Sequence, residues 1–310
     1  MSIIQADIFT KIIIVLQLIC GFYWKISSNK VVNALVRAYC VSITATVIVI
    51  ITYEWFVTLY RSVASIVVFA ATFYFVNIFV DLFSNGENFM KFIKNIRQPI
   101  TQDIRSSVNT PITAILLIST ICIRVFSHLK FQYDNGMWNP LISEATLILV
   151  IDIILYVSNS QRIMMFELLW RKMAALRNHL ERDLSSARRY ETREDLLKNK
   201  LKACVKIYNN ILNSTRMIDA QTKFLMLTTV TILMVQVLNQ LYVYIIEFKD
   251  YNTSVFLLEI PLRYITSLSP ALLAEMVNSE IDKMKLCIVK QLLVCHGTFN
   301  LYIFYGGYRL

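Results

Sequence analysis

The sequence predicts an all-α fold, a polytopic bundle of six membrane-spanning helices with its amino terminus in the cytoplasm. Composition is the first reason. The chain has 310 residues, of which 56% are hydrophobic, with only 6 Gly and 5 Pro, and its mean hydropathy is +0.53. A soluble core of this size requires fewer apolar residues. The other two reasons are the length of the apolar segments and the distribution of the basic residues between them.

The apolar segments have the length of membrane spans, for which about 20 mostly apolar residues are needed. Backbone polar groups in hydrocarbon have to be satisfied within the segment or the bundle, so such segments are expected to be helices. Six segments qualify: Ala38–Leu59, Val63–Phe83, Pro111–Ser127, Pro140–Ser158, Phe224–Phe248 and Ser254–Val277. They divide the chain into helices 1–4, within residues 38–158, and helices 5 and 6, within residues 223–277.

Residues 1–37 are predicted to form a cytoplasmic amphipathic segment. Ile8–Trp24 is apolar on most helical faces, and Trp24 and Lys25 stand at one end of it. This pattern is typical of a helix that lies at the inner membrane interface. Lys11 interrupts the apolar run, which argues against a seventh, partial span, and no cleavage site for a removable signal peptide follows.

Connections rich and poor in basic residues alternate along the chain. Arg61, Lys130 and Lys249 are alone in their connections, whereas 13 of the 31 Lys and Arg residues lie between Arg162 and Arg216. Basic loops are retained on the cytoplasmic side. The amino terminus is therefore expected inside, opposite to its place in rhodopsin-like G-protein-coupled receptors. Insertion bias also explains the net charge of +10, and no nucleic-acid recognition motif accompanies it.

The basic connection, residues 159–222, is predicted to be helical. Apolar residues recur at helical spacing in two runs: Leu168, Leu169, Met173, Leu176 and Leu180, then Leu196, Leu197, Leu201, Val205, Tyr208, Ile211 and Leu212. We expect the fourth and fifth helices to project below the membrane and to pack as a hairpin or against neighbouring subunits. The alternative is a solvated coil on anionic lipid, and Arg188 and Arg189 fit both.

Polar side chains inside the spans mark the candidate site, because each is costly in lipid and needs a partner or water. The deep ones are Asp152, Gln236, Asn239, Gln240, Glu259 and Arg263. One interpretation is that they form interhelical hydrogen bonds that hold the bundle together. The other is an outward-facing polar and aromatic cavity for a small molecule. The candidate pocket residues are Gln236, Asn239, Gln240, Tyr244, Glu259 and Tyr264.

Other motifs add little. Asn252 begins a glycosylation triplet in a loop that is expected outside. The histidines His128, His179 and His296 are far apart, and neither a phosphate-binding loop nor a nucleophile elbow occurs. We therefore expect no enzyme, no cofactor and no metal site.

The chain resembles the insect gustatory receptor family, within the insect chemoreceptor superfamily. The resemblance covers nearly the whole chain. It lies in the spacing of the spans, the internal amino terminus, the long basic connection after the fourth helix and the short loop after the fifth. The most local match is Cys295–Leu301, which is similar to the Cys-Gly, Phe and Asn/Asp positions that lead into the family's seventh helix.

This resemblance implies a ligand-gated cation channel that assembles as a homo- or hetero-tetramer with related receptors. A tastant would bind in an extracellular pocket among the upper helices, and the seventh helices would line the pore. The family's Thr-Tyr and spaced Gln-Phe are missing, and Leu301–Tyr305 is the last apolar run before Leu310. Five residues cannot cross about 30 Å of hydrocarbon. We expect residues 278–310 to form a cytoplasmic segment with a truncated start of helix 7.

The expected function is a gustatory (taste) chemoreceptor of the plasma membrane that senses a small molecule and admits cations. The alternative is a multi-pass transporter, or a scaffold or receptor subunit that does not conduct. Saturable uptake without current would favour this alternative. An amino-terminal tag that stains intact cells would instead favour a G-protein-coupled receptor.

Overall fold

The computed structural model of the chain contains helices and no strand among the residues that it describes. These residues are 8–27, 29–58, 75–76, 78, 92–93, 96, 111–134, 144–187, 194–216, 223–224, 226–228, 230–231, 234–235, 238 and 253–294. The predicted all-α class is confirmed for this part of the chain.

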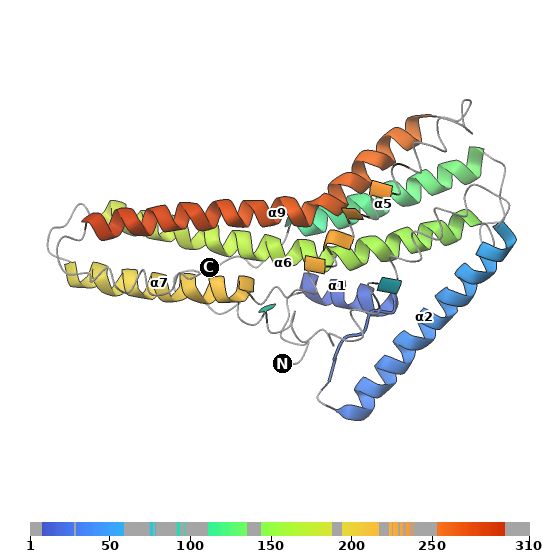
Figure 1. The fold of residues 1–310 in the computed structure, drawn as a ribbon, viewed down its shortest axis with the longest axis horizontal. Helices are drawn as coiled ribbons and strands as arrows, with labels where there is room; N and C mark the ends of the chain where they lie inside the picture. Colours follow the sequence, from blue (N-terminus) through green and yellow to red (C-terminus); the bar gives the residue numbers. More distant parts are fainter. Residues whose placement is uncertain are drawn as a thin grey trace.

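Two long helices form the axis of the molecule. α6 (Glu144–Ala187) has 44 residues and α9 (Thr253–Val294) has 42, so their lengths are about 66 Å and about 63 Å. They lie side by side and run in the same direction (Figure 1). Among the described helices this pair makes the most extensive contact.

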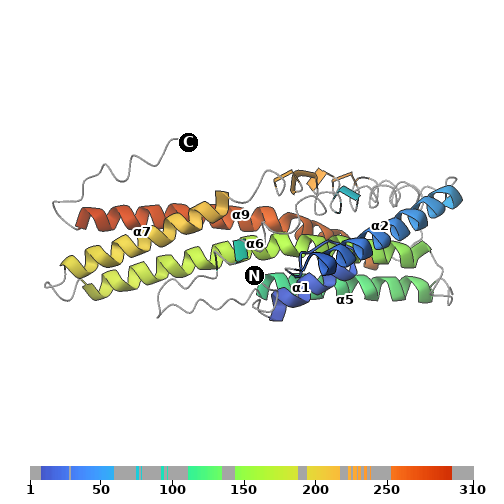
Figure 2. The same ribbon diagram turned by 90° about the horizontal axis from the view of Figure 1, so that it is seen from below.

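The helices α5 and α7 pack on opposite halves of this axis. α5 (Pro111–Asp134) contacts α6 and α9, and it runs antiparallel to them from the middle of the molecule toward one end (Figure 1). α7 (Glu194–Arg216) contacts α6 and runs back along its other half (Figure 2). We call residues 144–166 and 253–273 with α5 the α5 half, and residues 168–187 and 274–294 with α7 the α7 half.

The amino-terminal helices differ in how they meet this bundle. α1 (Ile8–Ile19) packs against α6, and after it Gly21 turns the chain with a φ of 88°, a conformation that glycine adopts at little cost. α2 (Lys30–Thr58) diverges from the bundle (Figure 1). It begins before Ala38, where the first span was predicted, because Asn29 caps it: Asn29 Oδ1 accepts the backbone N–H of Val31 at 2.9 Å.

The apolar core follows one stripe of α6. All five residues of the first predicted run, Leu168, Leu169, Met173, Leu176 and Leu180, are buried. The second run lies in α7, where Tyr208 and Ile211 are buried against the same core and Val205 and Leu212 pack beside them. Burying a large apolar side chain contributes about 1.5–3 kcal/mol. Within the described residues, α6 and α7 are helical and in contact with each other; the hairpin below the membrane stays a prediction.

The predicted spans are only partly described. Within the described part of the chain, two helices are long and apolar enough to cross a membrane, Lys30–Val49 within α2 and Pro111–Lys130 within α5. The fourth and sixth predicted spans fall, from residues 144 and 254 on, within the longer helices α6 and α9. Val63–Phe83 lies mostly, and Phe224–Phe248 partly, outside the described residues. The number of six spans therefore stays a prediction.

Candidate functional site

Most of the predicted ligand pocket lies outside the described residues. This holds for Gln236, Asn239, Gln240 and Tyr244, and also for the glycosylation candidate Asn252. Two pocket residues belong to α9. The backbone of Glu259 is helical, while its side chain is outside the description, and Tyr264 is half-buried. The pocket stays a prediction, with α9 as its described wall.

A neutral polar contact joins α9 to α5 close to Tyr264. The hydroxyl groups of Thr120 and Thr266 lie 3.1 Å apart, and both residues are buried. Thr266 Oγ1 also lies 2.8 Å from the carbonyl oxygen of Leu262, one turn back on α9. Hydroxyl pairs of this kind are how helices bond to one another where water is excluded.

α9 contains a bend at the same level. Pro261 and Pro270 lie inside the helix, and a proline lacks the N–H that would bond to the carbonyl four residues earlier. For Pro270 that carbonyl belongs to Thr266. α9 visibly changes direction in its first half (Figure 1), as expected from proline kinks.

A small cavity lies between α6 and α9 at this bend. Its volume is about 10 Å³, and its lining residues are Asn159, Arg162, Met226, Val230, Ser267, Pro270 and Ala271. A space of this size holds about one water molecule. This gap between the bend of α9 and α6 is too small for a tastant.

The cation at this gap is Arg162, which is only 5% exposed. Its Nη2 donates to Asn159 Oδ1 at 2.7 Å and contacts Ser158 Oγ at 3.5 Å. In the sequence Arg162 was assigned only as the first residue of the basic block. The polar run that starts at Ser158 could have indicated its hydrogen bonds, because residues three and four apart share a helix face.

Glu167 fixes the amino end of α5 to α6. Its side chain is fully buried, and its carboxylate oxygens accept the backbone N–H groups of Ile112 at 3.0 Å and Thr113 at 2.8 Å, and the Thr113 hydroxyl at 2.7 Å. Arg171 Nε lies 3.2 Å from the same carboxylate. A carboxylate at a helix amino end satisfies donors that have no partner within the helix and favours the helix dipole.

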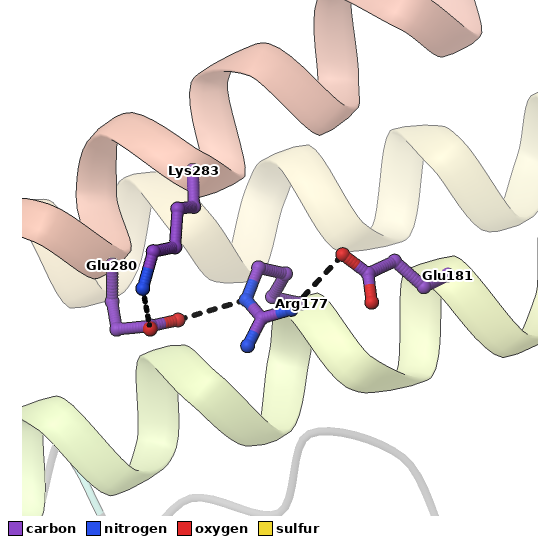
Figure 3. A network of polar contacts seen from close by, with 4 residues as sticks. All are labelled: Arg177, Glu181, Glu280 and Lys283. Atoms are coloured by element: carbon purple, nitrogen blue, oxygen red, sulfur yellow. Dashed lines mark hydrogen bonds and ion pairs between the residues drawn. The ribbon is translucent and has the colours of Figure 1, made fainter.

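On the carboxyl-terminal side of Glu167, ion pairs join α6 to α9. Arg177 on α6 lies between two carboxylates (Figure 3): its Nε is 2.8 Å from Glu280 on α9, and its Nη1 is 3.0 Å from Glu181 on its own helix. Lys283 Nζ lies 2.9 Å from Glu280. We call these four residues the stalk network.

The stalk network shifts the proton affinities of its members. Hydrogen bonds to Glu280 and Glu181 raise the pKa of Arg177. Burial by itself would raise the pKa of Glu280, but the hydrogen bonds from Arg177 and Lys283 outweigh burial and the pKa is lowered. Arg177 and Glu280 therefore stay charged at neutral pH, and the network joins the two long helices by ion pairs.

Lys172 holds a further segment against α6. The residue is only 5% exposed, and its ammonium group donates to the backbone carbonyl of Ile96. Phe92, Ile93 and Ile96 are themselves buried in the main core. Burial lowers the pKa of Lys172 to about 8, from its ordinary value of 10.5.

α1 is hydrogen-bonded to α6 near Arg162. Gln17 Nε2 donates to the carbonyl of Val157 at 3.2 Å and to Gln161 Oε1 at 3.4 Å, while Gln17 Oε1 accepts from Trp24 Nε1 at 3.0 Å. α1 and its connection to α2 are therefore fixed to the turn of α6 that precedes Arg162.

The described residues hold no group of three or more His, Cys, Asp or Glu side chains that could bind a metal ion. Comparisons with known proteins found no matching family model, no matching curated protein and no matching solved structure. Among the described helices, α6 contacts α1, α5, α7 and α9.

Proposed function

We propose that the chain is a subunit of a multi-pass plasma-membrane chemoreceptor of the gustatory kind. In this proposal a small molecule binds among the outer ends of the helices, and the response travels along α6 and α9 to the cytoplasm. The single observation that carries the proposal is that these two helices continue, in parallel, from an apolar half into an ionic half.

The exposure of the apolar helices supports a membrane setting. The apolar window of α2 is only 6% buried and that of α5 only 22%. A core helix of a soluble protein would be mostly buried. Large side chains such as Ile118 and Phe126 on α5, which are 60% and 67% exposed, face out of the bundle. Lipid is the medium that favours such a surface.

The lengths of the helices support a membrane domain with a cytoplasmic stalk. A hydrocarbon layer is about 30 Å thick, and α6 and α9 are each about twice that length. α5 has 24 residues, or about 36 Å, and its amino end is held at Glu167. The α5 half thus has the height of a bilayer, and the α7 half is the part that would project into the cytoplasm, where the basic residues are expected.

In this proposal the bend at Pro270 is the point about which the upper part of α9 moves. Above the bend α9 contacts α5 through Thr266, and below it α9 is locked to α6 at Glu280. A ligand that binds one position of the upper part of α9 better than the other shifts the population between them.

The test is a recording of cation current from cells that express the full-length transcript. Application of a panel of sugars and bitter alkaloids is expected to evoke a rapid inward current. The variant Asn239→Leu, in the predicted pocket, should abolish the response, whereas Asn213→Leu, at an exposed position of α7, should not. Saturable substrate uptake without current would instead establish the transporter alternative, and surface expression without either activity would establish a scaffold.

A further inference from the structure

α1 lies along α6 rather than across it (Figure 1). Its two side-chain contacts with α6 come in reversed order. Thr10, near the start of α1, donates from Oγ1 to Met164 Sδ at 3.7 Å, whereas Gln17, near its end, donates to the carbonyl of Val157 at 3.2 Å. α1 therefore runs antiparallel to α6. The sequence predicted a helix at the membrane interface, but a helix that follows a membrane-crossing helix has to enter the bilayer.

The depth of α1 follows from its position relative to Glu167, where α5 begins. Met164 precedes Glu167 by three residues and Val157 precedes it by ten, which correspond to about 4.5 Å and about 15 Å along α6. The hydrocarbon layer is about 30 Å thick. The start of α1 is therefore close to the level of Glu167, and its end is about halfway through a layer that begins there.

The carboxyl end of α1 satisfies its own backbone. Gly21 has a φ of 88°, the N–H of Phe22 donates to the carbonyl of Gln17 at 2.9 Å, and the N–H of Gly21 donates to that of Leu18 at 3.0 Å. This is the Schellman arrangement of a helix end. The last carbonyls of a helix otherwise bond to water, and hydrocarbon offers none. The end of α1 is thus suited to a medium without water.

The two faces of α1 differ in chemistry. Its polar side chains Thr10 and Gln17 are each only 1% exposed and turn toward α6, where both have partners. The outer face consists of Ile12, Val15 and Ile19, which are 47%, 51% and 59% exposed and share one side of the helix by their spacing. Water disfavours such a face, and acyl chains favour it.

The charge along this part of the chain is distributed in the same sense. Lys11 lies in the first turn of α1, and residues 12–24 contain no Lys, Arg, Asp or Glu. A lysine near the level of Glu167 can place its ammonium group among the headgroups, and the anionic lipids of the cytoplasmic leaflet attract it. The cation thus stands at the end of α1 that is nearer the cytoplasm, and the uncharged part lies deeper.

We propose that α1 is a re-entrant helix, which enters the inner leaflet from the cytoplasmic side along α6 and contacts its acyl chains through Ile12, Val15 and Ile19. The proposal rests on the membrane placement of α6 in the proposed function and is independent of ligand and current. Ile19 would then lie about 10 Å deeper than Ile12. A helix in the plane of the interface would hold all three residues at one depth.

The experiment measures the depth of nitroxide labels on the full-length chain in vesicles of phosphatidylcholine and phosphatidylserine. Ile12→Cys, Val15→Cys and Ile19→Cys are labelled one at a time, with the unsubstituted chain as background. Oxygen concentrates in hydrocarbon and a nickel chelate stays in water, so the ratio of their collision rates with the label reports depth. The ratio should rise from Ile12→Cys through Val15→Cys to Ile19→Cys.

Two controls separate this proposal from the membrane setting on which it rests. Ile118→Cys, exposed on α5, should give a lipid-like ratio, and Lys202→Cys, exposed on α7, a water-like one. With these controls as expected, equal ratios at the three α1 positions, or little collision with either reagent because a second copy covers the face, would overturn the re-entrant helix alone. A water-like ratio at Ile118→Cys would overturn the membrane setting as well.

Lysine substitutions test the same gradient without a label. Ile19→Lys should lower the unfolding temperature in these vesicles by about 5 °C or more, because a deep charge facing lipid is costly. Ile12→Lys, beside Lys11, should lower it by about 2 °C or less. Ile19→Leu keeps the apolar surface and should leave it unchanged. Equal shifts for the two lysine variants would contradict the difference in depth.

Discussion

The α5 half and the α7 half share the same two helices, α6 and α9, but the polar contacts that α9 makes in the two halves differ in chemistry. In the α5 half the described contact between α5 and α9 is a pair of threonine hydroxyls, Thr120 and Thr266. In the α7 half the link between α6 and α9 is the ion pair of Arg177 and Glu280. Neutral donors are stable in a water-free medium, whereas ion pairs at a partly exposed site are stable beside water.

The outer surfaces differ in the same way. α5 exposes Ile115, Ile118 and Phe126, each at least 60%. α7 exposes Lys202 and Lys206, and the adjacent part of α9 exposes Asp282. Under the proposed function the α5 half lies in lipid and the α7 half in water, with the boundary at Glu167, where α5 is anchored.

The largest effect is expected from Glu167→Ala, at the boundary between the halves. The change leaves the N–H groups of Ile112 and Thr113 and the charge of Arg171 without their buried carboxylate, which costs about 3–5 kcal/mol. Thermal unfolding in detergent should show a large loss of stability. Glu167→Gln keeps the size and one acceptor and should lose less. A Glu167→Ala chain as stable as the wild type would contradict the anchoring of α5.

Lys172 is expected to give the α7 half a dependence on alkaline pH. Its pKa in the folded chain is about 8, below the ordinary value of 10.5. Between these values the unfolded chain binds the proton and the folded chain does not, so stability should rise with pH across this window by at most about 1.4 kcal/mol per pH unit. Below pH 8 both states are protonated and the slope should vanish.

The measurement for Lys172 is the unfolding temperature as a function of pH in the wild type, Lys172→Met and Lys202→Met. The exposed control, Lys202→Met, should keep the slope of the wild type, because every other titrating group is shared. Lys172→Met should lose part of it. Identical slopes in all three chains would show that the pKa of Lys172 is the same in the folded and the unfolded chain, and would contradict this prediction.

A smaller effect is expected from Arg177→Ala in the stalk network. The change leaves Glu280, only 7% exposed, with Lys283 as its described partner, and should cost about 1–3 kcal/mol. High salt should reduce the difference from the wild type. Lys285→Ala breaks a pair with Asp282, which is 74% exposed, and should change stability by less than about 1 kcal/mol. Equal losses in both variants would show that burial does not strengthen the network.

The smallest effect is expected from Thr120→Val in the α5 half. Thr266 keeps its bond to the carbonyl of Leu262, so the loss should be about 0.6 kcal/mol. It should also be independent of salt, unlike the loss at Arg177. Thr46→Val, on α2, removes a bond that stays within its own helix and is the matched control. A salt-dependent loss at Thr120 would remove the distinction between the halves.

The sequence was sufficient to predict the helices whose apolar residues recur at regular spacing. The stripe from Leu168 to Leu180 and the pattern of α7 both follow from the spacing of three and four residues. The structure buries the stripe, and in α7 it buries Tyr208 and Ile211. Periodicity shows which face of a helix is buried. It does not show which helix covers that face, so the parallel pairing of α6 with α9 was not predicted.

The polar contacts of α6 were not predicted, for a related reason. Glu167 and Arg177 were part of a charged connection, and their partners Thr113 and Glu280 lie far away in sequence. Nothing in the local pattern separates a buried carboxylate from an exposed one. The start of α2 was missed for a different reason: charge was used as the boundary of the span, whereas Asn29 sets the start of the helix by capping it.

The direct test of the two-media account is labelling of single introduced cysteines with a membrane-impermeant maleimide, with the parent chain as background. Arg182→Cys, in the α7 half, should be labelled in sealed inside-out vesicles and protected in intact cells. Ile118→Cys, exposed on α5, should be protected in both. Labelling of Arg182→Cys in intact cells, or of Ile118→Cys as fast as Arg182→Cys in the vesicles, would contradict the account.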